Sequence, residues 1–350
     1  MIERCRRIAR WSGALAWWLV LASCGWLAGL PWGVSPARGE EAPREQGEIA
    51  FVPTPQESAV PERFRLGAHR FPWQAEHIAQ TPRMDVWNVT FPSPVTTPVT
   101  VNNTVHAEYY RARQPGRRPA VIVLHILGGD FELSRLFCNA LAQYGVHALF
   151  VKMPYYGPRR DPTVARRMVS TDPHETVAGL TQAVLDIRRA TAWLAARSEV
   201  DDQRLGIFGI SLGGITSSLA AAVEPRIHNV CLLLAGGDIG RVSWEAADLV
   251  KVRQKWLDKG RSREEFIRTL TLVDPVTYAA GARGKRILML NADHDEVIPR
   301  DCTLALWEAL GRPEIRWYAG GHYSVIVHLP RALLTVPHFF ASDEVLAGAR

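Results

Sequence analysis

The pentapeptide Gly209-Ile210-Ser211-Leu212-Gly213 has the G-x-S-x-G spacing that can present a serine as a nucleophile. Such a serine lies in a tight turn between a strand and a helix, where bulky side chains two residues away would clash. Glycine on both sides removes those side chains, and Gly214 lets the following helix pack closely. The backbone N–H of Leu212 would lie at the helix N-terminus, where it can stabilise an oxyanion. Ser211 is therefore the candidate nucleophile, with a structural serine as the alternative.

A base and an acid are needed as well, because a serine hydroxyl is a weak nucleophile. His322 follows a predicted strand and two glycines in GGHYSV (320–325), so its imidazole can reach Ser211 as a general base. Asp293 and Asp295 both follow the preceding predicted strand, in the order serine, acid, histidine that this kind of site uses. We favour Asp295 as the acid that orients the imidazole; Asp293 is the alternative acid and otherwise ties its loop by backbone hydrogen bonds. The other polar side chains nearby are expected to be solvated or to pack: Glu296, His328 and His338.

The loop HILGGDFE (125–132) follows the first predicted buried strand and is expected to supply the second oxyanion donor. Leu127 is the expected backbone donor, because the two glycines after it permit the turn. His125 is expected to shape this loop and not to transfer protons.

The segment MPYYGPRR (153–160) follows the second predicted buried strand, so it should lie at the carboxyl edge of the sheet, near the site. Tyr155 and Tyr156 can wall an acyl or sugar pocket, and Arg159 with Arg160 can meet an anionic substrate. The alternative is a surface turn whose arginines are solvated.

Alternating strands and helices must position these residues. The continuous apolar, β-branched run at 120–127 is typical of a strand buried on both faces of a parallel sheet, and further strands are predicted at 146–154, 204–210, 229–237, 285–292 and 314–320. Helical spacing predicts helices at 133–145, 175–198, 212–223, 302–311 and 324–340, the last with a kink at Pro330. Two half-buried antiparallel strands are predicted earlier, at 84–91 and 104–112. The pattern predicts an α/β fold with a doubly wound, mostly parallel sheet flanked by helices.

Four regions follow from this order. Residues 1–37 carry an arginine-rich start, a long uncharged stretch and a small-residue site at 35–37, which predicts an export signal. An uncleaved membrane anchor and a lipoprotein lipidated at Cys24 remain open, and membrane association is expected through this segment alone. Residues 38–83 are predicted to be a linker and an irregular lead-in. Residues 84–350 form the predicted main domain, with 238–283 as a helical insertion that can act as a partial lid.

Composition excludes several classes of function. The chain has 350 residues and a net charge of +6, and four arginines of the export segment supply part of this charge. The sequence contains no basic block with interleaved aromatics, so we do not expect nucleic-acid binding. Neither a CxxC nor an HExxH motif is present, so we expect no metal and no cofactor. Three cysteines follow the export segment, each in an apolar run, which favours buried reduced thiols over a disulfide framework: Cys138, Cys231 and Cys302.

The chain resembles the α/β-hydrolases, and more loosely their dienelactone-hydrolase and acetyl-xylan-esterase side. The matching motifs are LHILGG, GIFGISLGG, DPVTYA (274–279), NADHDEVIP and GGHY, within roughly residues 104–340. MPYYGPRR before a long helix is similar to the branch named α/β-hydrolase domain containing 18. The resemblance implies Ser211, Asp295 and His322 as a catalytic triad. Ile126 and Ala292 stand where these families commonly have glycine.

We therefore expect an exported serine hydrolase that cleaves carboxylic esters through an acyl-enzyme, with a small-molecule or carbohydrate ester as its substrate. A peptidase or a thioesterase would use the same three residues. A non-catalytic envelope protein that kept the fold as a binding module is the alternative from a different class.

Overall fold

The computed structural model describes residues 42–129, 131–246 and 250–342. The predicted export segment (1–37), including Cys24, lies outside these residues. The described chain from Ala42 onward belongs to one compact unit. It contains a ten-stranded sheet with the order β1-β2-β3-β4-β6-β5-β7-β8-β9-β10. The strands are β1 (Arg44–Phe51), β2 (His69–Gln80), β3 (Met84–Pro92), β4 (Thr104–Ala112), β5 (Arg118–Leu124), β6 (His147–Val151), β7 (Val200–Ile210), β8 (Asn229–Leu233), β9 (Arg286–Ala292) and β10 (Glu314–Tyr318).

The sheet has an antiparallel part and a parallel part. Strands β1 to β4 pair antiparallel, and β4 joins β6 in the same sense. From β6 across to β10 every pairing is parallel. Side chains on both faces of β5 are buried, which explains its unbroken apolar run. The predicted α/β sheet is confirmed.

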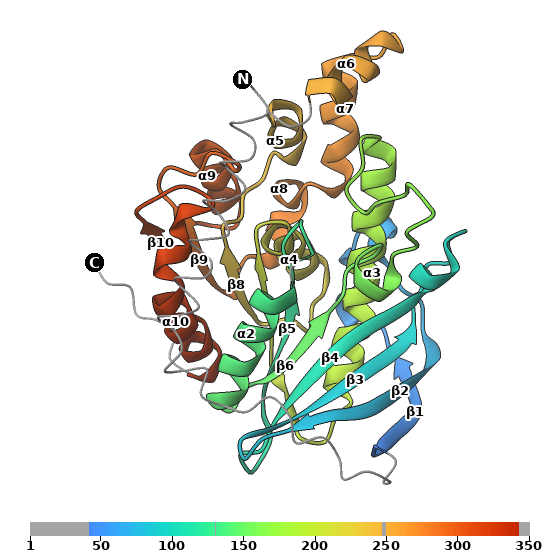
Figure 1. The fold of residues 1–350 in the computed structure, drawn as a ribbon, viewed down its shortest axis with the longest axis vertical. Helices are drawn as coiled ribbons and strands as arrows, with labels where there is room; N and C mark the ends of the chain where they lie inside the picture. Colours follow the sequence, from blue (N-terminus) through green and yellow to red (C-terminus); the bar gives the residue numbers. More distant parts are fainter. Residues whose placement is uncertain (1–41, 130, 247–249, 343–350) are drawn as a thin grey trace. The chain divides into compact units, whose positions relative to one another are not determined.

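Helices cover both faces of the sheet (Figure 1). One core cluster contains side chains from α3, α4, α7 and α9, and a second contains side chains from α2 and α10. The two clusters lie on opposite faces, because alternate residues of β5 belong to one or the other. The helices are α2 (Phe131–Gln143), α3 (Pro173–Ala195), α4 (Leu212–Val223), α5 (Ile239–Glu245), α6 (Val250–Asp258), α7 (Arg263–Leu270), α8 (Pro275–Tyr278), α9 (Arg300–Ala309) and α10 (Leu329–Ala341).

The prediction of an irregular lead-in before residue 84 is wrong for the described part of that region. It contains β1 and β2, which extend the sheet at one edge. Strand β2 buries alternate side chains, among them Phe71 and Trp73, and the Trp73 ring meets Trp193 of α3 edge-on at 5.6 Å. This alternation is hard to recognise in the sequence, because the residues of β1 that face outward are charged and β2 contains a proline.

The region 238–283 is helical, as predicted. Helices α5 and α7 pack on each other, and α7 also contacts α3. Helix α8 and the 3₁₀ turn Ala279–Ala282 pack against α4, so this end of the region supports the sheet. Its action as a partial lid stays a prediction.

The last helix differs from its prediction in detail. A 3₁₀ turn (Ser324–His328) precedes α10, and Pro330 occupies the first turn of α10, so there is a junction between two helices and not a kink within one. The segment Ser324–Ala341 is long and apolar enough to cross a membrane by composition. However, α10 buries Val336, Phe339 and Phe340 in the core cluster that it shares with the sheet.

Candidate active site

Ser211 occupies a strained turn between β7 and α4. Its φ of 53° and ψ of −115° are unusual for a residue with a side chain, and its N–H donates to the Leu233 carbonyl at 2.8 Å. A Cβ on Gly209 would lie 2.2 Å from the Gly213 carbonyl oxygen, and one on Gly213 would lie 2.7 Å from the His125 carbonyl oxygen. Both glycines of the motif are therefore required by the close backbone contacts of this turn.

His322 joins Ser211 to Asp295. Its Nε2 lies 3.0 Å from Ser211 Oγ, and its Nδ1 lies 2.8 Å from Asp295 Oδ2. The other carboxylate oxygen accepts from the N–H groups of Val297 at 2.9 Å and Ile298 at 2.7 Å. The side chains of His322 and Asp295 are only 8% and 3% exposed. With Nδ1 protonated and bound to the carboxylate, Nε2 is free to accept the serine proton.

Asp293, the alternative acid, lies elsewhere in the same loop. Its Oδ1 accepts from the Gly320 N–H at 2.9 Å and contacts His294 Nδ1 at 2.7 Å. These hydrogen bonds hold the pKa of Asp293 below its ordinary value. Asp293 ties the acid loop to the loop that precedes His322, which is the role expected for it if Asp295 meets the histidine.

Glu296 has a contact that sequence reasoning missed. We expected a solvated side chain, and it is exposed, but its Oε2 accepts from the backbone N–H of His322 at 2.8 Å. The available signal was the crowding of three carboxylates into DHDE (293–296) opposite a Gly-Gly-His segment. His328 and His338 were expected to pack or to be solvated, and both do so. His328 bonds the Ala319 carbonyl at 3.1 Å, and His338 is exposed on α10.

The two expected oxyanion donors lie in segments that approach each other at Gly213, two residues after Ser211. Leu212 is the first residue of α4, where backbone N–H groups have no acceptor within the helix. Leu127 lies in the turn after β5, which Gly129 closes through its N–H bond to the Ile126 carbonyl at 3.1 Å. The end of β5 approaches α4 closely at Gly213. The role of both N–H groups stays a prediction.

His125 fastens the loop after β5 to the segment after β6. Its Nδ1 donates to the Ile126 carbonyl at 2.8 Å, and its Nε2 accepts from the Met153 N–H at 3.1 Å. Burial lowers the pKa of His125 to about 4, so the ring is neutral near pH 7. Both ring nitrogens are occupied, which agrees with a structural role in the loop.

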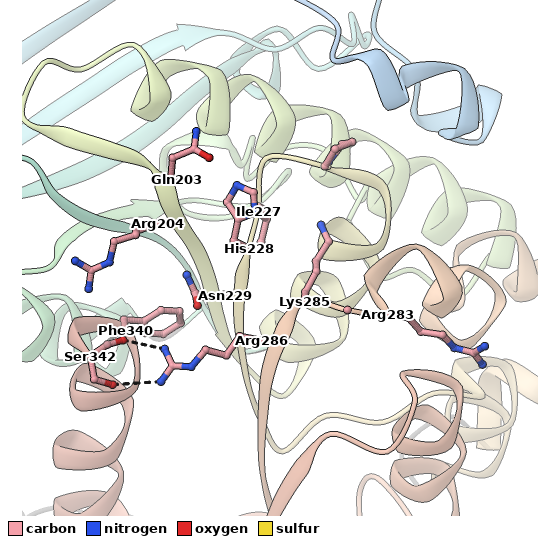
Figure 2. Close-up of a pocket in the computed structure, with 12 residues that line it drawn as sticks. Gln203, Arg204, Ile227, His228, Asn229, Arg283, Lys285, Arg286, Phe340 and Ser342 are labelled. Carbon is pink, nitrogen blue, oxygen red and sulfur yellow. Dashed lines mark hydrogen bonds between the residues drawn. The ribbon is translucent and has the colours of Figure 1, made fainter. Parts of the chain in front are cut away.

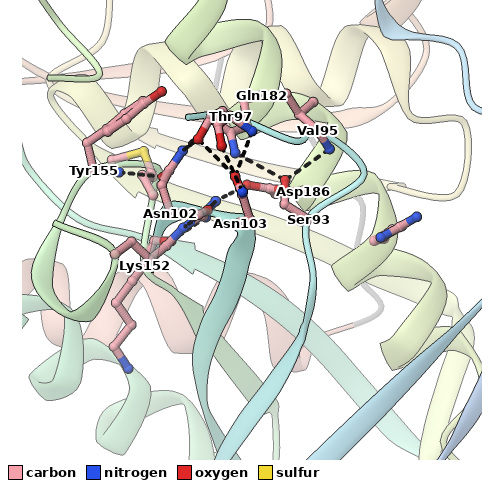
Figure 3. Close-up of polar contacts among 12 residues, drawn as sticks. Ser93, Val95, Thr97, Asn102, Asn103, Lys152, Tyr155, Gln182 and Asp186 are labelled. Carbon is pink, nitrogen blue, oxygen red and sulfur yellow. Dashed lines mark hydrogen bonds and ion pairs between the residues drawn. The ribbon is translucent and has the colours of Figure 1, made fainter. Parts of the chain in front are cut away.

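The two tyrosines after β6 lie beside this loop. Tyr156 is half-buried, and its ring meets the His125 ring at 4.5 Å between centroids. Tyr155 has a φ of 65° and is buried, and its N–H donates to Asn102 Oδ1 at 2.9 Å (Figure 3). Asn102 in turn donates to Gln182 of α3 at 2.9 Å. A buried polar network from the β3–β4 connection and α3 therefore fixes this turn, and Tyr156 is the residue of the pair with exposed surface.

The prediction that Arg159 meets an anionic substrate is wrong. The side chain is fully buried, and its guanidinium forms an ion pair with Asp186 of α3 at 2.8 Å. The other donors bond the carbonyl oxygens of Asn102 and Lys152. Its hydrogen bonds are consumed inside the protein, whereas the neighbouring Arg160 is exposed.

A cavity of about 560 Å³ lies near the amino ends of the parallel strands, whereas Ser211 lies at their carboxyl ends (Figure 2). It is lined by residues at the amino ends of β7, β8 and β9, including Arg204, Asn229 and Lys285. Ser211 follows the carboxyl end of β7, so the cavity is separated from it by the length of the strand. Among the described residues, no group of three or more His, Cys, Asp or Glu side chains is arranged to hold a metal ion.

Two family models match parts of the chain. The model of the prolyl oligopeptidase family matches residues 181–327, which include Ser211, Asp295 and His322. The model named α/β hydrolase domain containing 18 matches residues 80–242. Each covers less than half of the chain.

Curated relatives and solved structures are similar at a greater distance. An uncharacterised protein of Mycobacterium tuberculosis is 28% identical over 239 residues, which is 64% of this chain and 54% of that protein. The chain thus spans about half the length of this relative. Esterase YjfP of Escherichia coli is 22% identical, over 63% of this chain and 88% of that protein.

Two solved structures share the fold. Acetyl xylan esterase 1 from Thermoanaerobacterium sp. JW/SL YS485 has a TM-score of 0.59 at 20% identity, covering 79% of this chain and 88% of that one. An acetyl xylan esterase from Paenibacillus sp. R4 has a TM-score of 0.60 at 23% identity, covering 76% and 88%. The topology of the sheet, the turn at Ser211 and the similarity to these two solved structures all indicate the same fold.

Proposed function

We propose that this chain, an α/β-hydrolase by its fold, is an exported serine hydrolase that cleaves carboxylic esters. The observation that carries the proposal is the line of hydrogen bonds from Ser211 Oγ through His322 to Asp295. A binding module on the same fold has no need of a strained serine joined to a buried histidine and aspartate. The esterases among the relatives support an ester as the substrate.

The reaction follows from the geometry. Ser211 Oγ attacks the acyl carbon while His322 Nε2 takes its proton, and Asp295 stabilises the imidazolium. The N–H groups of Leu212 and Leu127 stabilise the oxyanion of the tetrahedral intermediate. His322 then gives its proton to the leaving alcohol, and an acyl-enzyme remains on Ser211. Water, deprotonated by His322, attacks that ester, and the acid leaves as Ser211 recovers its proton.

Removal of the nucleophile or the base tests this mechanism. Ser211→Ala and His322→Ala should each lower kcat for p-nitrophenyl acetate by at least about 10⁴-fold, because neither an activated oxygen nor a base remains. Ser211→Ala should also abolish labelling by a fluorophosphonate probe. Ser198→Ala, at an exposed serine, is the control and should behave as wild type. Labelling that persists in Ser211→Ala would contradict the assignment of the nucleophile.

The substrate class within esters can be found with a panel. Because two structural relatives are named acetyl xylan esterases, acetylated sugars belong in it beside p-nitrophenyl esters of graded acyl length. We expect turnover of small-molecule or carbohydrate esters without added metal or cofactor. If wild type and His322→Ala hydrolyse all of them at the same background rate, the binding-module alternative is favoured.

A peptidase is the second candidate, favoured by the prolyl oligopeptidase match over the candidate triad. Thioesters would react by the same steps. A prolyl p-nitroanilide and an acyl-coenzyme A, assayed beside the ester panel, separate the three classes by kcat/KM. A higher kcat/KM on the anilide than on every ester would replace the ester proposal by the peptidase.

Export rests on residues 1–37, which lie outside the described part of the chain. Fractionation of expressing cells, followed by N-terminal sequencing and mass analysis of the mature protein, tests it. A free N-terminus near residue 38 indicates cleavage, an intact N-terminus in the membrane fraction indicates an anchor, and lipid mass on Cys24 indicates a lipoprotein. Recovery of the intact chain in the cytoplasm would contradict export.

A further inference from the structure

Side-chain acceptors hold three consecutive backbone N–H groups around the candidate base. The segment is Gly320-Gly321-His322, between β10 and the 3₁₀ turn that precedes α10. The three bonds are Gly320 N–H to Asp293 Oδ1 at 2.9 Å, Gly321 N–H to Ser324 Oγ at 2.8 Å, and His322 N–H to Glu296 Oε2 at 2.8 Å. Two of these acceptors belong to the loop that also carries Asp295.

The missing side chain of Gly321 makes room for the Glu296 carboxylate. A Cβ at this position would lie 2.1 Å from Glu296 Oε2 and 3.2 Å from the His294 carbonyl oxygen. Gly321 thus allows the two loops to touch at the point where the carboxylate reaches the His322 N–H. A side chain at this position would push the end of the Glu296 side chain away, so the contact with the His322 N–H depends on this glycine.

We propose that Glu296 is a positioning residue that fixes His322 through its backbone while Asp295 fixes the ring, an assignment that rests on the proposed function. The two carboxylates are consecutive in the chain and bind the same histidine at two points, its N–H and its Nδ1. Gly320 also bonds Asp293 and His294 of that loop, but Glu296 is the acceptor that holds the N–H of His322 itself. Without it, the backbone of His322 can shift and carry Nε2 with it. Glu296 does not touch the substrate or Ser211 in this role.

A small displacement of Nε2 matters because it lies 3.0 Å from Ser211 Oγ. A shift of about 1 Å would take the pair out of hydrogen-bond range, and misplacement of that size lowers rates by up to about 100-fold. Loss of Glu296 should therefore lower kcat and leave KM nearly unchanged. The carboxylate is exposed, so the melting temperature should change by less than about 3 °C.

Amide hydrogen exchange reads the contact without any substrate. In Glu296→Ala the peptide that contains residues 319–323 should exchange at least about tenfold faster than in wild type. Glu296→Gln keeps an oxygen acceptor and should restore most of the protection. Glu308→Ala, at an exposed acid of α9, is the control and should leave the peptide unchanged. Equal exchange in wild type and Glu296→Ala would overturn the proposal.

Kinetics show whether the effect passes through the histidine. Glu296→Ala should lower kcat about 10- to 100-fold in the wild-type background and have no effect in the His322→Ala background. Glu296→Gln should recover most of the loss. An equal fractional loss in both backgrounds would indicate general damage to the fold and would also overturn the proposal.

A second double-mutant cycle combines Gly321 with Glu296. Gly321→Ala should displace the carboxylate and lower kcat as Glu296→Ala does, and the double variant should be no worse than Glu296→Ala alone. Additive losses would separate the two residues and contradict the contact. If the wild type hydrolyses none of the substrates while amide exchange changes as expected, the proposed function fails. The contact between the two loops then still stands.

Discussion

At the scale of single residues, burial separates the arginines that follow β6. Arg159 and Arg160 are neighbours in the sequence, but the first is fully buried and the second is exposed. Their difference comes from residues far away in the chain, because Asp186 lies on α3 and Asn102 lies in the β3–β4 connection. A local pattern such as YYGPRR contains no information about those partners.

Arg159→Ala should destabilise the protein strongly. It leaves the fully buried Asp186 carboxylate without its ion-pair partner, which costs about 3–5 kcal/mol in comparable sites. Urea unfolding measures the loss, and Arg160→Ala should lie within about 0.5 kcal/mol of wild type. If Arg159→Ala keeps its stability and loses only the hydrolysis of anionic esters, the arginine faces the substrate after all.

His125 should make the stability depend on pH. Its pKa is about 4 in the folded protein and near 6.5 in an unfolded chain, so the unfolded state takes up a proton first as the pH falls. The contribution is complete above pH 6.5 and is lost between pH 6.5 and 4, by up to about 3 kcal/mol. Urea unfolding across this range should show a shallower loss in His125→Gln. Equal slopes for the two proteins would show that the ring titrates freely.

The candidate triad was accessible to sequence reasoning because a motif and a chain order define it. Ser211 was recognised by its glycines together with its place between a predicted strand and a predicted helix, and His322 by its place in a Gly-Gly segment after a strand. Asp293 and Asp295 follow the same strand, and only the path of the loop in space shows which one meets the imidazole. Glu296 was missed for the same reason, since its partner is a backbone group of another loop.

At the scale of elements, the junction of β7 and α4 is the most demanding local structure. Gly209→Ala would place a methyl group 2.2 Å from a carbonyl oxygen, so the backbone of the turn must move. We expect the variant to lose fluorophosphonate labelling by at least about 100-fold, because Ser211 Oγ moves away from His322. Gly67→Ala, at an exposed glycine with open space around it, should label as wild type does. Normal labelling of Gly209→Ala would show that the turn tolerates a side chain.

Elements with one strong period were predictable, and the two strands before residue 84 were not. The range of α4 agrees with its prediction residue for residue, and the strands of the parallel part were all found. Strands β5, β6 and β8 are buried on both faces and therefore mostly apolar, whereas β10 is only partly buried. Strands β1 and β2 were missed because half of their residues face outward and are polar or charged. Their pairing is decided by contact with α3, which a local reading does not see.

At the scale of the whole molecule, a buried ion cluster joins the N-terminal strands to the hydrolase core. Arg188 of α3 is fully buried and binds Glu57, before β2, and Glu224, at the end of α4. It also donates to the Phe64 carbonyl. The region before residue 84 is therefore an integral part of the fold.

Truncation tests this integration. A chain that starts at residue 42 should fold and keep its melting temperature within about 3 °C, because it retains the whole compact unit. A chain that starts at residue 67 loses β1, Glu57 and Phe64, and leaves Arg188 and Arg226 to share Glu224 alone. We expect it to be insoluble or to melt at least about 10 °C lower in a thermal scan. Equal melting of the two chains would show that β1 is dispensable.

The three cysteines of the described chain carry a consequence for how the protein is made. Each is a buried free thiol, and burial raises the pKa of Cys138 and Cys231 above the ordinary value. Once folded, these sulfurs are protonated and out of reach of oxidants. In the oxidising compartment that the proposed export implies, they are open to mixed disulfides while the chain is still unfolded. Folding then competes with oxidation, so variants that fold slowly should be lost to thiol adducts even where their final structure would be sound.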